Sequence, residues 1–149
     1  MGEARRLLAT PLAIWEREGV HTALVKAGLP ADDTREPHVL LWRFETYENV
    51  PAGFGGLEIH GSDALLRSLV TLPLLRQVGL GAGMVSMLET EARARNCRRI
   101  YLLTTSQTKF FKRLGYAACA RDAVPDAIRK SRQFAVLCPA GATAMVKVL

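Results

Sequence analysis

The spacing of hydrophobic and polar residues changes near the middle of this chain. In the first half, apolar and β-branched runs alternate with polar turn segments, a pattern that predicts strands joined by short connections. The predicted strands are residues 5–10, 38–47, 54–60 and 64–72. Because short turns join the last three, they predict an antiparallel meander. Residues 11–30 have a proline near their start and Gly28 and Pro30 at their end, which predicts a helix.

The second half begins with a helical pattern. Apolar residues recur every three or four positions over 81–95, which predicts an amphipathic helix, and 98–105 is predicted to be a buried strand. With the strand at 64–72, this order makes a βαβ unit whose two strands are parallel. The remaining predictions are a short helix at 107–116, a strand at 117–121, a helical or irregular segment at 124–139 and a final strand at 142–149. The whole pattern predicts an α+β fold with a mixed sheet.

Composition bounds the class of protein. The length of 149 residues predicts one domain, and 49% hydrophobic with 23% charged residues is typical of a soluble globular protein. No apolar run approaches the roughly 20 residues of a membrane span, and the N-terminus does not have the pattern of a signal peptide. We therefore expect a cytoplasmic protein with no membrane partner; a homodimer stays open.

The charged residues, the cysteines and the histidines give no positive sign of a nucleic-acid partner, a disulfide framework or a metal site. The net charge of +6 permits an anionic partner, yet the basic residues are scattered and not interleaved with aromatic ones. A nucleic-acid-binding domain would therefore rest on charge alone, and no nucleic-acid partner is expected. The three cysteines are far apart, which predicts a reducing compartment and no disulfide framework. The three histidines have no metal-ligand spacing, so we expect no metal.

A glycine-containing loop, RQVGLGAGM at residues 76–84, precedes the helix of the βαβ unit. Backbone amides at a helix N-terminus favour a phosphate, and Gly79 and Gly81 would let a diphosphate approach them closely. The loop is not a dinucleotide-binding fingerprint, because Met84 stands where the third glycine is required. It is not a P-loop either, since no Gly-Lys-Ser/Thr follows. The pattern is Arg-x-x-Gly-x-Gly; a plain turn is the alternative.

The order of strand, Arg-x-x-Gly-x-Gly loop, helix, strand and short aromatic helix resembles the GNAT superfamily of N-acetyltransferases, which use acetyl-CoA. The resemblance is strongest from Leu65 to Tyr116 and covers most of the chain. It implies one GNAT-like domain over residues 1–149. The implied fold is a mixed, mostly antiparallel sheet of six to seven strands with a central splayed parallel pair and flanking helices.

The same resemblance implies a site for acetyl-CoA as cosubstrate. The Arg-x-x-Gly-x-Gly loop would cradle the pyrophosphate, and the preceding strand would offer main-chain groups to the pantetheine arm. The cofactor residues implied in this way are Leu69, Val70, Thr71, Arg76, Gln77, Val78, Gly79, Leu80, Gly81, Ala82, Thr105, Phe110, Phe111 and Arg113.

Several short segments look like the small acetyltransferases found in arsenic-resistance gene clusters. These segments are GLE at 56–58, LLRSLV at 65–70, YLLTT at 101–105, FFKRLGY at 110–116 and LCP at 137–139. This closer resemblance implies acetylation of a small amino compound, with an organoarsenical as one candidate, and it does not identify the acceptor.

Acetyl transfer to an amine needs a base, a polarised thioester carbonyl and a proton for the leaving thiolate. Many GNAT members are described as supplying that proton from a tyrosine in an F-Y-x-x-x-G-F segment, and here Phe111 stands at the tyrosine position. Tyr116 at the final aromatic position is one alternative donor; water and the substrate are others. The missing tyrosine also supports a second hypothesis, a CoA-binding regulatory or interaction module that has lost catalysis.

Polar residues inside predicted strands are the candidates for the acceptor side. Glu58 is the predicted base, with a solvent-facing strand position as the alternative. Arg67 and Ser68 interrupt an apolar run, and Arg67 is predicted either to bind a substrate carboxylate bidentately or to pair with Glu58 across neighbouring strands. Trp15 is predicted to be core or a wall of the acceptor site. Cys138 is either a reactive thiol or, as we favour, a small buried hydrophobe.

Overall fold

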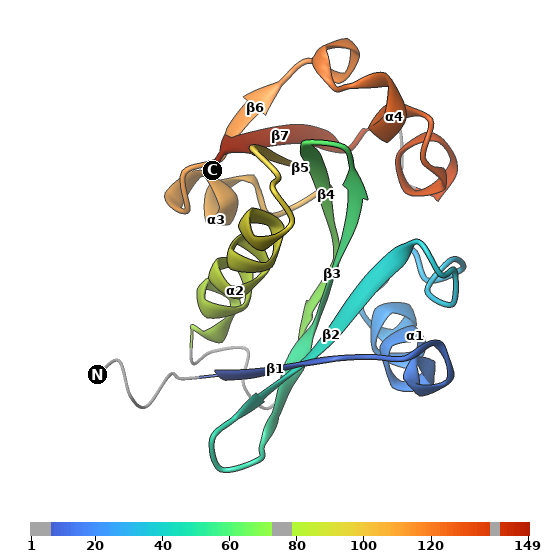
Figure 1. Ribbon diagram of the computed structural model, residues 1–149, viewed down its shortest axis with the longest axis vertical. Helices are drawn as coiled ribbons and strands as arrows, with labels where there is room; N and C mark the ends of the chain where they lie inside the picture. The colour runs from blue at the N-terminus through green and yellow to red at the C-terminus, as the bar shows by residue number, and fades with distance from the viewer. Residues whose placement is uncertain (1–6, 73–78, 138–140) are drawn as a thin grey trace.

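The computed structural model describes residues 7–72, 79–137 and 141–149, and it contains one sheet of seven strands in the order β1-β2-β3-β4-β5-β7-β6 (Figure 1). The strands are β1 (Leu7–Pro11), β2 (Val39–Thr46), β3 (Pro51–His60), β4 (Asp63–Thr71), β5 (Arg99–Thr104), β6 (Ala117–Cys119) and β7 (Thr143–Val148). The β4–β5 pair is parallel and the other pairs are antiparallel. The predicted α+β fold with a mixed, mostly antiparallel sheet is therefore confirmed.

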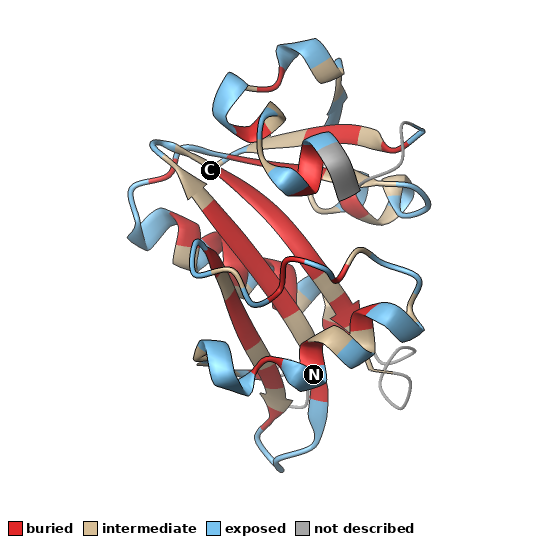
Figure 2. Cartoon of the chain, turned by 90° about the vertical axis from the view of Figure 1, so that its right-hand side faces the viewer, coloured by how far each residue is buried: buried red, intermediate tan, exposed pale blue. Residues whose placement is uncertain are grey.

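Helices cover both faces of this sheet. They are η2 (Ile14–Glu16), α1 (Glu18–Lys26), α2 (Leu80–Ala94), α3 (Thr108–Arg113), η4 (Arg121–Ala123), α4 (Asp126–Arg129) and η5 (Gln133–Leu137). Helices α2 and α3 lie on one face, while α1 and the segment around α4 lie on the other (Figure 1). The middle of the sheet is consequently buried, whereas the outer helix surfaces and most connections are exposed (Figure 2).

The fit between α2 and β3 follows from residue size. The predicted apolar stripe of α2, which includes Met84 and Leu88, is fully buried against the sheet. Opposite it, a Cβ on Gly55 would lie 2.8 Å from Leu88 Cδ1 of α2, whereas one on Gly56 would lie 2.6 Å from Leu41 Cδ2 of the neighbouring strand β2. Glycine is therefore needed at Gly55 for the close approach of α2 and at Gly56 for the side chain of Leu41.

The predicted helix over 11–30 is shorter in the structure. The backbone at Arg17, with φ −96° and ψ 6°, separates the 3-10 turn η2 from α1. The buried Arg17 guanidinium donates to the carbonyl oxygens of Leu12, Thr34 and Glu36 at 3.0 to 3.3 Å. These bonds tie the entry to α1 to the connection that follows it, so tertiary contacts override the helical pattern there.

Strands β4 and β5 separate soon after they begin. Their pairing runs only from Asp63↔Arg99 to Leu65↔Tyr101, while β5 stays paired with β7 along its whole length. The splayed parallel pair that the family resemblance implied is thus present. The β3–β4 register also shifts, because Phe54 pairs with Val70 and Gly56 with Arg67. Two β4 residues therefore oppose the single Gly55, which is a β-bulge beside the opening.

Candidate active site

A cavity of about 980 Å³ occupies the opening between β4 and β5. It is lined from the α2–α3 side by residues such as Gly79 and Phe110, and from the α1 side by residues such as Lys26 and Pro30. The cavity therefore passes through the sheet where the strands separate.

Most residues predicted to bind the cofactor line this cavity. Those that do are Leu69, Val70, Thr71, Gly79, Gly81, Ala82, Thr105, Phe110, Phe111 and Arg113. The side chain of Leu80 is instead buried in the core. The predictions for Arg76, Gln77, Val78 and Cys138 lie outside the described residues.

The N-terminus of α2 has the features of an anion site. Gly79 caps it with φ +76°, no side chain caps the first amides, and the first turn has no acidic residue. A Cβ on Gly81 would lie 3.2 Å from Phe110 Cζ, so a larger residue would crowd the cavity here. Uncapped amides, the helix dipole and the absence of side chains fit the diphosphate of CoA.

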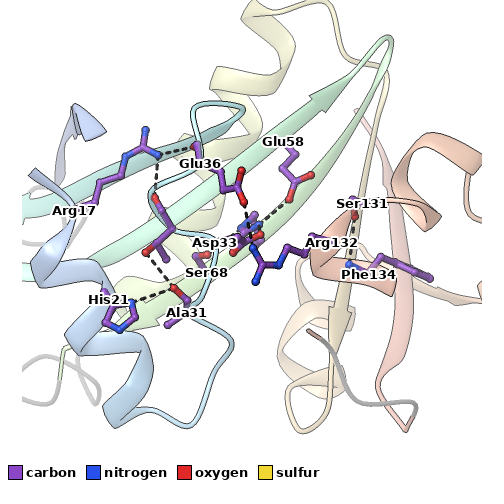
Figure 3. Close-up of polar contacts among 12 residues, drawn as sticks. Arg17, His21, Ala31, Asp33, Glu36, Glu58, Ser68, Ser131, Arg132 and Phe134 are labelled. Carbon is purple, nitrogen blue, oxygen red and sulfur yellow. Dashed lines mark hydrogen bonds and ion pairs between the residues drawn. The ribbon is translucent and has the colours of Figure 1, made fainter. Parts of the chain in front are cut away.

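Three charged side chains, Asp33, Glu58 and Arg67, form a buried cluster on the α1 side of the sheet, and Figure 3 labels its two carboxylates. Arg67 Nη1 donates to Asp33 Oδ2 and to Glu58 Oε2, each at 2.7 Å, and Nη2 donates to Asp33 Oδ1. Glu58 is 1% exposed, and its other oxygen lies 3.1 Å from Nε2 of His60. The predicted Arg67–Glu58 ion pair is confirmed, and the solvent-facing alternative for Glu58 is wrong.

Asp33 is the member of this cluster that the sequence analysis missed. It belongs to the polar connection between α1 and β2, where an aspartate is ordinarily a turn residue. Its neighbour Asp32 is exposed, whereas Asp33 is buried. The only signal in the sequence was this pair of adjacent aspartates, and it does not say which one turns inward.

Charge pairing dominates the ionisation of the cluster. Burial would raise the pKa of Asp33, but the hydrogen bonds and positive charge of Arg67 outweigh it and hold the pKa below its ordinary value. Burial would likewise lower the pKa of Arg67, and its bonds to Asp33 and Glu58 reverse that effect and raise it. The pKa of Arg17 is lowered by burial and by the nearby charge of Arg67. Arg67 is therefore a permanent internal cation.

The guanidinium of Arg67 is hydrogen-bonded to side chains of the protein itself. Besides the two carboxylates, its Nε donates to Ser68 Oγ at 3.1 Å. The bidentate position that was predicted for a substrate carboxylate is taken by Asp33, which corrects that expectation. Arg67 and Ser68 line the cavity. Glu58 is not among its lining residues and lies behind Arg67, to which it is hydrogen-bonded.

The structure corrects the expectation for Trp15. This residue lies on η2, its side chain is 86% exposed, and it is not among the residues that line the cavity. It is therefore neither core nor a wall of this cavity. None of the residues of η2 is buried, so this turn faces solvent.

No tyrosine is among the described residues that line the cavity. Phe111 lines it and packs edge-on against Phe110 and Tyr116, with ring centroids 5.0 and 5.5 Å apart. Tyr116 is buried behind Phe111, where its hydroxyl donates to Glu89 Oε2 at 2.9 Å. Burial and the charge of Glu89 raise the pKa of Tyr116 far above its ordinary value. Tyr116 is thus a packing residue.

We expect Tyr116→Phe to lower the free energy of unfolding by about 1–2 kcal/mol, because a buried hydrogen bond to a charged group is lost. Lys147 Nζ, 3.0 Å from Glu89 Oε2, still satisfies the carboxylate, which limits the loss. The acetylation rate should not change. Urea unfolding and steady-state kinetics test this, with the exposed Tyr47 replaced by Phe as control. A large fall in kcat would make Tyr116 the proton donor instead.

No group of three or more metal-ligating side chains is found among the described residues, and the expectation that the protein has no metal stays a prediction. Within the same residues, no helix is long and apolar enough to cross a membrane.

The opened sheet and the uncapped helix N-terminus beside it suit a CoA thioester, and the family match places the chain among the N-acyltransferases that use one. The chain belongs to the acetyltransferase (GNAT) family, whose model matches residues 4–116. It is an N-acetyltransferase of that family and uses acetyl-CoA. No curated protein matches the sequence.

Solved structures have the same fold at low sequence identity. N-acetylglutamate synthase from Neisseria gonorrhoeae, complexed with coenzyme A and N-acetyl-glutamate, matches with TM-score 0.74 and 16% identity over 95% of this chain. The match covers 35% of the synthase chain, so this chain spans about a third of that protein. A GNAT acetyltransferase from Staphylococcus aureus matches with TM-score 0.76 and 12% identity over 97% of this chain and 99% of its own. Rv2747 from Mycobacterium tuberculosis, in complex with CoA and NLQ, matches with TM-score 0.75 and 18% identity over 95% and 99%.

Proposed function

We propose that residues 1–149 act as one domain that transfers the acetyl group of acetyl-CoA to the amine of a small molecule. The observation that carries this proposal is the single cavity that runs from the N-terminus of α2 to the Arg67 cluster. In the reaction a C–N bond forms and the C–S bond breaks; the amine loses a proton and the thiolate gains one. A cavity open from both faces of the sheet can receive the donor from one side and the acceptor from the other.

The donor side has a proposed role for each element. The amides that follow Gly79 at the start of α2 bind the diphosphate, and Arg113 on the same side adds a positive charge. The main chain of β4 from Leu69 to Thr71 hydrogen-bonds the pantetheine arm. The arm lies on the side of β4 from which β5 separates beyond Leu65.

The acceptor side is proposed to hold a small amine. Lys26 at the end of α1, Pro30 in the connection after it, and Gln133 and Ala142 line this part of the cavity. An amino-organoarsenical or another toxic amino compound is the acceptor favoured by the segments that resemble the arsenic-resistance acetyltransferases. That finer proposal rests on those segments alone.

Titration and turnover together test the proposal. Calorimetry with acetyl-CoA should detect binding, and thiol release should rise when the correct amine is added from a panel that includes amino-organoarsenicals. Binding without thiol release for any amine would favour the alternative, a CoA-binding module without catalysis. Absence of binding at millimolar acetyl-CoA would overturn both functions.

Two roles remain for Glu58, the predicted base and a positioning residue that holds Arg67. The geometry favours positioning, because Glu58 contacts Arg67 and His60 and is not a lining residue of the cavity. We expect Glu58→Gln to lower kcat less than tenfold and to leave the shape of the pH–rate profile unchanged. Loss of the acidic limb with a fall of about 10²-fold or more would identify a base. Glu45→Gln, at a surface pair with Arg43 on β2, is the matched control.

A further inference from the structure

Ser68 has a backbone conformation that is unusual for its residue type. Its φ is 56°, in the left-handed region, and it stands inside β4 rather than in a turn. The other non-glycine residues with positive φ in the described chain are Asn49 and Asn96, an amino acid that tolerates this region. The conformation costs roughly 1–2 kcal/mol. Strain of this kind is retained where the surrounding structure enforces it, most often at functional sites.

The strain changes where the Ser68 side chain lies. Successive side chains of a regular strand point to opposite faces, so Ser68 should face away from Arg67. The bulge opposite Gly55 and the left-handed φ instead bring the two side chains together, with Arg67 Nε 3.1 Å from Ser68 Oγ. Both residues line the cavity, three positions or fewer beyond Leu65, the last β4 residue paired with β5.

The hydrogen bond with Arg67 decides how the Ser68 hydroxyl can be used. A guanidinium only donates, so Ser68 Oγ is the acceptor and its own proton is not used in this bond. Among the described residues, no acceptor is recorded for that proton. A charge-assisted bond to Oγ also polarises the hydroxyl and makes it a better donor. The structure thus holds a polarised O–H at the wall of the cavity, directly before the Leu69–Thr71 edge.

We propose that Ser68 donates this hydrogen bond to the carbonyl oxygen of the acetyl thioester. The inference rests on the proposed function, because it requires acetyl-CoA along the β4 edge. No covalent bond changes at Ser68: the hydroxyl keeps its proton and stabilises the negative charge that develops on the oxygen as the amine attacks. Arg67 is the positioning residue that orients the hydroxyl. This hydrogen bond to the carbonyl oxygen is separate from protonation of the leaving thiolate, for which Phe111 has no hydroxyl.

Two substitutions remove the hydroxyl and differ in their effect on backbone strain. Ser68→Ala keeps the left-handed strain, whereas Ser68→Gly relieves it. In infrared difference spectra of bound acetyl-CoA labelled with ¹³C at the carbonyl, without acceptor, both variants should have the carbonyl band at higher wavenumber than the wild type. With acceptor, kcat should fall on the order of 10²-fold in both. Because only Ser68→Gly gains stability, agreement between the variants assigns the effect to the hydroxyl.

Ser86→Ala, at an exposed position of α2, is the control and should behave as wild type. If both Ser68 variants bind acetyl-CoA and have the wild-type carbonyl band, the inference is overturned and the proposed function stands. If the wild type does not bind acetyl-CoA, both are overturned.

Discussion

Arg67→Met is expected to lower the free energy of unfolding by about 3–5 kcal/mol. The substitution removes the shared partner of Asp33 and Glu58 and leaves two buried carboxylates without their cation. Domains of this kind are stable by only about 5–15 kcal/mol, so the loss is a large fraction of the total. The volume of the Arg67 stem is kept by methionine, and the effect therefore reports on charge more than on packing.

Urea unfolding of purified variants measures this loss, with Arg95→Met as the matched control. Arg95, directly after α2, pairs with the half-exposed Glu91, and such a pair contributes about 0.3–0.5 kcal/mol. Its guanidinium also lies 5.5 Å from the centroid of the Trp42 ring, which adds about 0.5–1 kcal/mol to the expected loss in the control. Arg67→Lys keeps the positive charge but not the planar guanidinium, and we expect its free energy of unfolding to lie between those of the wild type and Arg67→Met. A loss below 1 kcal/mol for Arg67→Met would mean that Asp33 and Glu58 have other means of neutralisation.

The pH dependence of stability tests the same cluster. The pKa of Asp33 is lowered in the folded state, so the cluster contributes stability above the ordinary carboxyl pKa of about 4 and loses it as pH falls through the lower folded value. Wild-type stability should therefore decrease on acidification below about pH 4. In Arg67→Met this decrease should become smaller, because Arg67 is what depresses the pKa.

Gly79→Val is expected to weaken acetyl-CoA binding on the order of 10²-fold. Valine does not tolerate the left-handed φ of +76° at this position, so the first turn of α2 should shift. Displacing two amides that each bond an anionic oxygen loses about 1.5 kcal/mol apiece, which corresponds to that factor. Calorimetric titration with acetyl-CoA gives the measurement.

Gly61→Val separates the loss of the site from the loss of stability. Gly61 has a similar φ of +64° in the β3–β4 turn, with open space around a would-be Cβ, and it is not a lining residue of the cavity. Both variants should unfold more easily than the wild type, and only Gly79→Val should bind acetyl-CoA more weakly. Equal affinity in the two variants would show that α2 does not hold the diphosphate.

Local patterns in the sequence were sufficient for the elements that surround the donor side. Apolar spacing predicted α2 and the strands on either side of it, because a helix stripe and a buried strand each need a continuous local pattern. The glycine loop predicted an anion site at the start of α2, since a helix N-terminus and small residues are properties of one short segment. The sequence also showed directly that position 111 is phenylalanine and has no hydroxyl.

The acceptor side was decided by contacts between distant segments. Asp33 and Arg67 are 34 positions apart, and nothing in either segment specifies their pairing. The bond of Arg17 to the connection after α1 shortened a helix that the local pattern predicted to be long. Buried charges must find partners wherever the fold brings them, so their pairing is a property of the tertiary structure.

The sequence alone determined the order of strands and helices, the glycine loop at the start of α2 and the family resemblance. Only the tertiary structure decided that β4 separates from β5 after Leu65, that Asp33 binds the Arg67 guanidinium, and that the Ser68 side chain lies next to Arg67. The physical reason is that helix and strand periodicity is written in neighbouring residues, whereas a bulge, a strained φ and a buried ion pair are stabilised only by the elements packed around them.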